Sequence, residues 1–245
     1  MGKKTEWFAD WFDSPYYHIL YGHRDQSEAE FFLRNLINKY QPKPNASIID
    51  LACGKGRHSI FLNSLGFDVT GVDLSNESIR AANAFANQTL HFEVGDLRSL
   101  KSTKSFDFAL NLFTSFGYFE DLDTDLQVIQ NIHQLLEPKG IFLIDFFNAH
   151  KVIQHLVQAE TIERQGIQFH ISRKVEQGKI LKNIAFEHQG KAHQYQELVQ
   201  ALTQKDFENL LNAANFKIID CFGAYDLSSF NSQSSDRLIL IAQKN

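Results

Sequence analysis

The segment 48–75 constrains the fold most, because two short apolar runs flank a glycine-containing turn and a helix-like stretch within 28 residues. The first apolar run ends at Asp50, and Gly54 and Gly56 follow it. Glycines at the end of a buried strand let a ligand approach the backbone, and the helix that follows offers unpaired N–H groups. Taken alone, such a turn indicates a strand-to-helix connection as readily as a binding site.

The same alternation of apolar runs and helix-like stretches continues along the chain. We predict strands at 47–51, 68–73, 90–94, 106–113, 141–147, 216–221 and 237–242. We predict helices at 27–40, 56–65, 76–87, 123–136, 150–158 and 205–215. Strands that alternate with helices are typical of α/β proteins. The pattern predicts a seven-stranded, Rossmann-like sheet that is mostly parallel, with an antiparallel last strand and helices on both faces.

The alternation is interrupted between 161 and 203, where short alternating strands are separated by turns at Gly178 and Gly190. We interpret this stretch as an inserted antiparallel β-meander. The chain is therefore predicted to be a single domain, 1–245, that carries an inserted β subdomain at 150–203.

Composition narrows the class of partner. The chain has 24 basic and 29 acidic residues, a formal net charge of -5, which gives little attraction for nucleic acid or an anionic membrane. Its two cysteines, Cys53 and Cys221, are too far apart to indicate a disulfide framework or a metal site. No stretch matches a signal peptide or a membrane span. We expect a cytoplasmic protein with a small-molecule substrate, and the oligomeric state stays open.

Acidic residues around the turn indicate the kind of ligand. Asp73 ends the second strand, where a carboxylate can accept hydrogen bonds from both ribose hydroxyls. A dinucleotide site would place a third glycine at the position of Ser59, and Asp50 before the glycines would repel a pyrophosphate. The same carboxylate can attract an ammonium group. The turn therefore favours a cationic, amino-acid-bearing ligand.

The stretch IIDLACGKGRHS…GVDLS resembles the first two motifs of the class I S-adenosylmethionine-dependent methyltransferases. It departs once, with Ala52 where the first glycine is usual, and we expect alanine to be a mild change there. GDLRSL resembles the motif whose acidic residue meets the adenine amino group, and NLFTSFGYF occupies the position whose backbone holds the methionine part. The aromatic segment WFDSPYYHILYGHRD is similar to the N-terminal lid of small-molecule members, which implies a helical lid over 1–40.

The resemblance implies S-adenosylmethionine as cofactor and a set of cofactor-binding residues. These are Asp50, Ala52, Cys53, Gly54, Gly56, Asp73, Leu74, Asp96, Leu97, Asn111, Leu112, Tyr17, Tyr21 and Arg24. We expect Gly56→Val to abolish cofactor binding by filling space that the ligand needs, while the protein stays folded.

The predicted activity is methyl transfer to an O, N or C nucleophile of a small molecule. Phe116, Tyr118, Phe147 and Tyr195 are candidates to line the acceptor pocket. His18, His23 and His150 are candidate bases, and none is assigned as catalytic because the sulfonium leaving group is already activated. Two alternatives stay open: a cofactor-binding protein of the same fold without turnover, and an NAD-dependent oxidoreductase.

Overall fold

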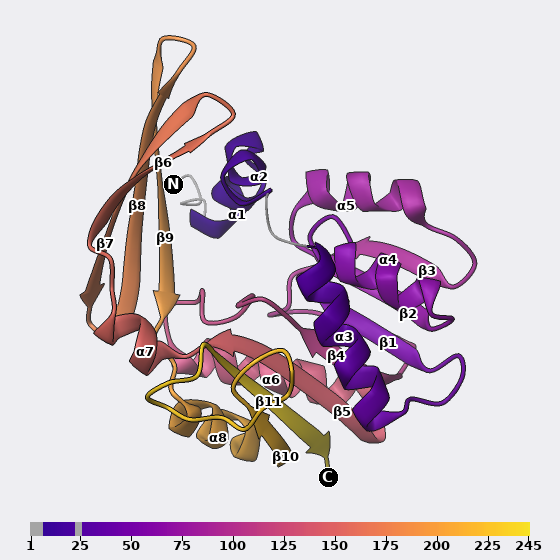
Figure 1. The fold of residues 1–245 in the computed structure, drawn as a ribbon. Helices are drawn as coiled ribbons and strands as arrows, with labels where there is room; N and C mark the ends of the chain where they lie inside the picture. The colour runs from indigo at the N-terminus through magenta and orange to yellow at the C-terminus, as the bar shows by residue number, and fades with distance from the viewer. Residues whose placement is uncertain (1–6, 23–25) are drawn as a thin grey trace.

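The computed structural model describes residues 7–22 and 26–245, which contain a seven-stranded sheet and a separate four-stranded sheet (Figure 1). The helices are α1 (Trp7–Phe12), α2 (Pro15–Tyr21), α3 (Gln26–Tyr40), α4 (Arg57–Ser64), α5 (Asn76–Ala82), α6 (Leu122–Leu135), α7 (Ala149–Gln154) and α8 (Gln204–Ala213). The strands are β1 (Ser47–Leu51), β2 (Asp68–Asp73), β3 (Leu90–Val94), β4 (Phe106–Asn111), β5 (Leu136–Phe147), β6 (Ala159–Arg164), β7 (Ile167–Glu176), β8 (Lys179–His188), β9 (Lys191–Gln200), β10 (Phe216–Phe222) and β11 (Arg237–Lys244).

The larger sheet has the strand order β10-β11-β5-β4-β1-β2-β3. Its neighbours pair in parallel except β11, which is antiparallel to both β5 and β10. The predicted seven-stranded, mostly parallel sheet with an antiparallel last strand is thereby confirmed. Because β1 to β5 run in parallel, their carboxyl ends meet along one edge, and the start of β11 lies at that same edge.

Successive residues of the central strands face opposite sides of this sheet and fill two different cores. Ile48 packs with α3, α4 and α5 residues, whereas Ile49 packs with α6 and α8 residues. Leu110 and Ala109 of β4 divide in the same way. Both faces are therefore covered by helices, as the continuous apolar runs predict for a parallel sheet.

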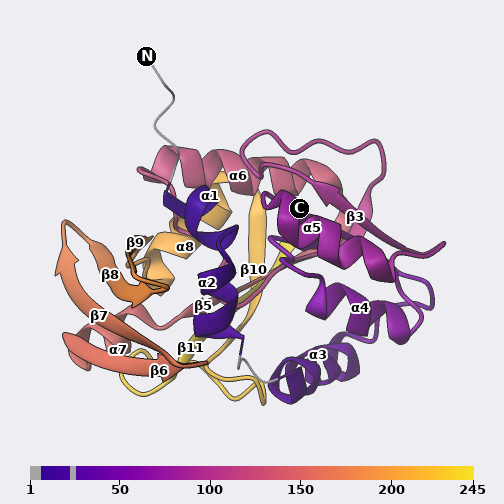
Figure 2. The same cartoon turned by 90° about the horizontal axis from the view of Figure 1, so that it is seen from above.

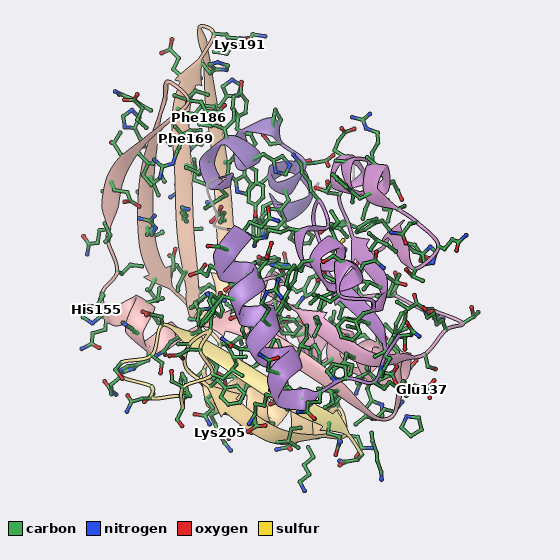
Figure 3. All side chains as sticks on the ribbon, turned by 45° about the vertical axis from the view of Figure 1, so that its right-hand side comes forward. Glu137, His155, Phe169, Phe186, Lys191 and Lys205 are labelled. Carbon is green, nitrogen blue, oxygen red and sulfur yellow. The ribbon has the colours of Figure 1, made fainter. Side chains whose placement is uncertain are left out.

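The smaller sheet is an antiparallel meander in the order β6-β7-β8-β9. The predicted antiparallel meander is thereby confirmed, and three of its strands are ten residues long. One face packs against α1 and α2 around Trp11, Phe169 and Phe186, and the last two rings lie 4.7 Å apart (Figure 3). Seen from the side and from above, α1 and α2 lie between the meander and the larger sheet (Figures 1 and 2).

Several predicted boundaries are wrong. The helix predicted over 76–87 ends at Ala82 and continues as a 3-10 turn at Asn83–Phe85. Strand β5 begins at Leu136 directly after α6, five residues earlier than predicted, because Leu136 pairs with Phe106. Helix α3, which falls within the predicted lid, packs Phe32 and Leu33 into the core on the α4 side of the sheet. Within the described residues, no helix is both long and apolar enough to cross a membrane.

Candidate active site

Three adjoining cavities lie where the carboxyl edge of the sheet meets α1, α2 and the meander. Cavity A, of about 760 Å³, lies above the ends of β2 and β3. Cavity B, of about 280 Å³, lies against the turn after β1, and Cavity C, of about 520 Å³, opens toward the meander. Phe12, Ser115 and Tyr118 line all three cavities. The three cavities therefore adjoin one another between Phe12, the last residue of α1, and the loop after β4.

The turn between β1 and α4 forms one wall of Cavities A and B. Ala52, Gly54 and Gly56 all have positive φ, of 58°, 56° and 81°. A Cβ at Gly54 would meet nothing within 4 Å, so this glycine faces open space. A Cβ at Gly56 would lie 2.6 Å from the ring of Phe92 and 3.3 Å from the Cβ of Ala82. Only Gly54 leaves room for a ligand.

Two expectations for this turn are therefore wrong. A side chain at Gly56 collides with the core between α5 and β3, so Gly56→Val would damage the fold rather than leave a folded protein without cofactor. Alanine at position 52 is not a mild change, because its φ of 58° lies in the left-handed region that costs an L-residue about 1–2 kcal/mol. This strained residue lies in the turn that lines Cavities A and B.

Asp73 ties the turn to the end of β2. Its Oδ2 accepts a 2.8 Å hydrogen bond from the Gly54 N–H, and its Oδ1 accepts a 2.8 Å bond from the Ser75 N–H. Burial raises the pKa of this carboxyl, and the two backbone hydrogen bonds act against that rise. The side chain lines Cavities A and B, where each oxygen retains a lone pair for a ligand hydroxyl.

Asp50 lies behind the turn and lines none of the three cavities. Its side chain is buried and its Oδ2 accepts a 2.6 Å hydrogen bond from the Ser59 hydroxyl. Burial raises the pKa of Asp50 to about 7, because the Ser59 hydrogen bond only partly offsets the loss of hydration. Its negative charge can still act on Cavity B through the low-dielectric turn, but it does not reach the cavity by contact.

Cavity A collects the residues predicted to hold an adenosine. Leu74 and Leu97 present apolar side chains to it, and Leu74 stays 36% exposed. Asp96 also lines it, paired with the Arg98 guanidinium by bonds of 2.9 Å and 3.0 Å from Nε. Burial by itself would raise the pKa of Asp96, but the hydrogen bonds and charge of Arg98 outweigh it and lower that pKa.

Sequence reasoning missed the part of Cavity A that comes from α1 and the loop after it. Phe8 and Asp13 line the cavity, and Arg98 lies over the ring of Phe8 at 5.9 Å. The Asp13 Oδ1 accepts a 2.5 Å hydrogen bond from the hydroxyl of Ser75, the N-cap of α5. These contacts span more than 60 residues, and no local pattern in the sequence signals them.

Cavity B brings together the turn, α2 and the loop after β4. Five of the predicted cofactor-binding residues line it, namely Cys53, Gly54, Leu112, Tyr17 and Tyr21. Lys55 and Arg57 line it too and supply positive charge, although the predicted set omits both. Arg24 lies outside the described residues. Burial and then the charge of Lys55 lower the pKa of His18, which also lines this cavity.

Asn111 lies beneath the site and lines none of the cavities. Its side chain is fully buried, and its Nδ2 donates to the carbonyl oxygens of Leu51, at 3.3 Å, and of Ser115, at 3.1 Å. Asn111 thus joins the end of β1 to the loop after β4, whereas the neighbouring Leu112 reaches Cavity B.

Cavity C has an aromatic wall and a charged wall. Tyr118 and Phe147 line it, whereas Phe116 lines Cavity A and Tyr195 packs on Trp11 with ring centroids 4.5 Å apart. On the meander side, the Glu197 carboxylate accepts hydrogen bonds from Trp11 Nε1 at 2.7 Å and from the Tyr21 hydroxyl at 2.6 Å. Lys182 lies beside both Tyr21 and Glu197.

Comparison with known proteins agrees with this geometry. A model of a methyltransferase domain family matches residues 42–215, so the chain belongs to this family of class I S-adenosylmethionine-dependent methyltransferases. The predicted family, fold and methyl donor are thereby confirmed. Residues elsewhere in the chain, including α1 and α2, lie outside the matched range.

The chain is similar to methyltransferases whose names give different substrate classes. A glycine/sarcosine N-methyltransferase of Parasynechococcus marenigrum is 30% identical over 171 residues, which cover 66% of this chain and 57% of the relative. A ubiquinone biosynthesis O-methyltransferase of Rickettsia canadensis is 27% identical over 125 residues, covering 50% of this chain and 51% of the relative. The chain spans about half the length of the curated relatives it matches.

Solved structures resemble the fold over nearly the whole chain. An S-adenosylmethionine-dependent methyltransferase from Clostridium acetobutylicum superposes with a TM-score of 0.80 at 20% identity, covering 94% of this chain and 96% of that one. An amino pentose methyltransferase from Micromonospora echinaspora gives a TM-score of 0.70 at 14% identity, covering 95% and 98%. At these identities the likeness concerns the fold alone.

Proposed function

We propose that this protein transfers the methyl group of S-adenosylmethionine to a small-molecule acceptor bound in Cavity C. The observation that carries the proposal is the meeting of three cavities at Phe12, Ser115 and Tyr118. Cavity A has the apolar and acidic lining that suits an adenosine, and Cavity B has the open glycine and the cations that suit an amino-acid end. Cavity C then adjoins the place where the methyl group would lie.

The residues fit this cofactor on three counts. Gly54 leaves a space beside the backbone that any side chain would narrow. Asp73 presents two carboxylate oxygens to Cavities A and B, as a ribose diol requires. Lys55 and Arg57 lie at Cavity B, where a carboxylate would meet positive charge.

The cofactor supplies a methyl group on a sulfonium, which is an activated leaving group, so the protein has mainly to align and to exclude water. Alignment by itself contributes about 7–11 kcal/mol in well-oriented reactions. The ring of Phe12 lies 5.0 Å from that of Tyr17 and 5.4 Å from that of Tyr118, so aromatic rings surround the place where the three cavities adjoin and keep it apolar. His18, whose pKa burial lowers, lines Cavity B rather than the acceptor-side Cavity C, so we assign it no catalytic role.

We also propose that α1 and α2 form the lid over the site, and that 150–203 forms the acceptor-side wall. Asp13 joins the lid to Ser75 at the cofactor side, and Trp11 joins it to Glu197 on the meander. Both N- and O-methyltransferases occur among the relatives, which supports an O or N nucleophile of a small molecule as the acceptor. The absence of a nucleic-acid partner stays a proposal that the acidic net charge supports, and a cytoplasmic location stays a proposal as well.

The charge of Cavity A argues against a dinucleotide. Among the described residues that line it, Asp10, Asp13, Asp73 and Asp96 are acidic, and Arg98 is cationic but already pairs with Asp96. A phosphate that extended into Cavity A would face this net negative charge, whereas the turn itself carries the cations Lys55 and Arg57 at Cavity B.

Calorimetry with S-adenosylmethionine and with NAD tests the proposal directly. We expect micromolar binding of S-adenosylmethionine and none of NAD, and the reverse would overturn the assignment. Formation of S-adenosylhomocysteine from pools of small O- and N-nucleophiles then tests turnover. Tight cofactor binding without product from any pool would favour the alternative of a binding protein without turnover.

A further inference from the structure

The loop after β4 contains two consecutive residues in a conformation that their side chains disfavour. Phe113 has a φ of 57° and Thr114 a φ of 64°, both in the left-handed region. Neither is glycine, and Thr114 is β-branched, so its positive φ is a marked outlier. Such strain persists only where the surroundings fix the backbone, and it concentrates at functional sites.

The surroundings that fix this turn are Asp145 and Arg237. Asp145, near the end of β5, is fully buried; its Oδ2 accepts a 2.8 Å hydrogen bond from the Phe113 N–H, and its carbonyl oxygen accepts a 2.9 Å bond from the Thr114 N–H. Arg237, the first residue of β11, donates from Nε to Asp145 Oδ1 at 2.7 Å and from Nη2 to Thr114 Oγ1 at 3.1 Å. Two side chains thus hold both strained residues.

Tyr225 completes this network from the loop before β11. Its hydroxyl donates to Asp145 Oδ2 at 3.2 Å, and its ring lies 5.3 Å from that of Phe113. Arg237 can reach the turn because β11 runs antiparallel to β5 and begins at the carboxyl edge of the sheet. Because β11 is antiparallel, its first residue, Arg237, lies at the carboxyl edge; the first residue of a parallel strand would lie at the opposite edge.

The turn is the wall that separates the cofactor side from the acceptor side. Phe113 lines both Cavity B and Cavity C, Thr114 lines Cavity C, and Ser115 lines all three cavities. The ring of Phe113 also lies under the Arg57 guanidinium at 4.7 Å and beside the His58 ring at 5.0 Å. A change in the backbone of 113–114 would therefore move side chains that line both Cavity B, on the cofactor side, and Cavity C, on the acceptor side.

We propose that the Asp145–Arg237 ion pair is a positioning device for methyl transfer: it holds Phe113 and Thr114 in the left-handed conformation that shapes the wall between cofactor and acceptor. Arginine suits this task because its planar fork donates to Asp145 and Thr114 at once, whereas lysine offers one point charge. The inference rests on the proposed function, because it assigns the ion pair a role in that same site.

The pair Thr114→Ala and Thr114→Gly isolates the strain. Both variants lose the hydroxyl that Arg237 contacts, and they differ by one methyl group. Alanine still disfavours a positive φ, so the turn is expected to relax, whereas glycine adopts it freely. Measured by calorimetry with S-adenosylhomocysteine, we expect Thr114→Ala to raise the Kd five- to tenfold and Thr114→Gly to stay within twofold of the wild-type protein.

Arg237→Lys tests the ion pair itself. We expect a Kd increase of about tenfold in the wild-type background and of less than threefold in the Thr114→Gly background, where there is less strain to hold. Arg80→Lys is the matched control, because Arg80 pairs with Glu77 on the exposed side of α5, away from all three cavities, and should leave the Kd unchanged. Urea unfolding of each variant identifies any loss of affinity that follows from unfolding.

Equal Kd values for Thr114→Ala and Thr114→Gly would overturn the positioning role, as would an Arg237→Lys effect of the same size in both backgrounds. If Arg237→Lys does not fold, the Thr114 pair decides the question by itself. Wild-type protein that binds neither S-adenosylmethionine nor S-adenosylhomocysteine would overturn the proposed function as well. If the wild-type protein binds normally and the variants have the same Kd as the wild type, only the positioning role is overturned.

Discussion

Two turns at the carboxyl edge of the sheet adopt left-handed backbone, and they achieve it by opposite means. The turn after β1 has positive φ at Ala52, Gly54 and Gly56, so two of its three special positions are glycine. The turn after β4 has positive φ at Phe113 and Thr114 and uses no glycine there. Glycine allows the left-handed backbone in the turn after β1, whereas contacts from β5 and β11 impose it in the turn after β4. The sequence therefore predicts the left-handed backbone in the first turn but not in the second.

The buried carboxylates beside the two turns also differ in the group that binds them. Asp145 has the Arg237 guanidinium at 2.7 Å, whereas Asp50 has a serine hydroxyl at 2.6 Å as its hydrogen-bond partner. Burial raises the pKa of Asp50 to about 7, and the hydrogen bond from Ser59 only partly offsets that rise.

The largest expected effect comes from a methyl group at Gly56. Gly56→Ala places a Cβ 2.6 Å from the Phe92 ring at a φ of 81°, so overpacking adds to the cost of a left-handed alanine. We expect the free energy of unfolding to fall by about 3 kcal/mol or more, measured by urea denaturation.

Gly54→Ala is the matched control for this change, since it has the same sign of φ but open space around the new Cβ. It should cost about 1 kcal/mol of stability and act mainly on the Kd for S-adenosylmethionine. Equal losses of stability in the two variants would show that the glycines do not differ in role.

The next effect is a pH dependence from Asp50. Its folded pKa of about 7 exceeds the value near 4 in an unfolded chain, so the folded state binds more protons between pH 4 and pH 7. The contribution of this group to stability is therefore full below about pH 4 and is lost as the pH rises through 7, on the order of 4 kcal/mol. Asp50→Asn should flatten this slope in urea titrations at several pH values, and an unchanged slope would contradict the assignment.

A smaller effect is expected on binding from Asp73→Asn. The amide keeps one acceptor oxygen but loses the charge and the second acceptor, so a ribose hydroxyl loses a charged hydrogen bond. We expect the Kd for S-adenosylmethionine to rise about tenfold, or about 1.4 kcal/mol, by calorimetry. Asp107→Asn, a similar change at the far end of β4 away from the cavities, should leave the Kd unchanged. Equal effects of the two variants would remove Asp73 from the cofactor site.

The smallest effect is a gain in stability from Ala52→Gly. Glycine removes the cost of a φ of 58° but adds freedom to the unfolded chain, which leaves a net gain of about 0.5–1 kcal/mol. Ala109→Gly, in the ordinary extended backbone of β4, should destabilise instead. A loss of stability in Ala52→Gly would mean that the methyl group of Ala52 contributes packing that outweighs the strain.

Local chemistry allowed much of the fold to be predicted. Apolar runs that alternate with amphipathic stretches specify parallel strands and covering helices, and the change to two-residue alternation after 160 specifies the meander. Boundaries were less predictable, since pairing across the sheet decides them; Leu136 joins β5 because Phe106 lies beside it. The place of α3 also follows from packing, because its Phe32 and Leu33 lie in the core with residues of α4 and α5.

The residues that the sequence by itself determined are those whose role depends on their own backbone and near neighbours: the glycine turn, Asp73 at the end of its strand, and the apolar pattern that makes the sheet. The tertiary structure alone decided the rest. It showed that Gly56 serves packing while Gly54 serves the cavity, and it brought Asp13 to Ser75 and Arg237 to Thr114 across long stretches of chain. Strain at a turn without glycine leaves no mark on the local sequence, because the groups that hold it come from distant strands.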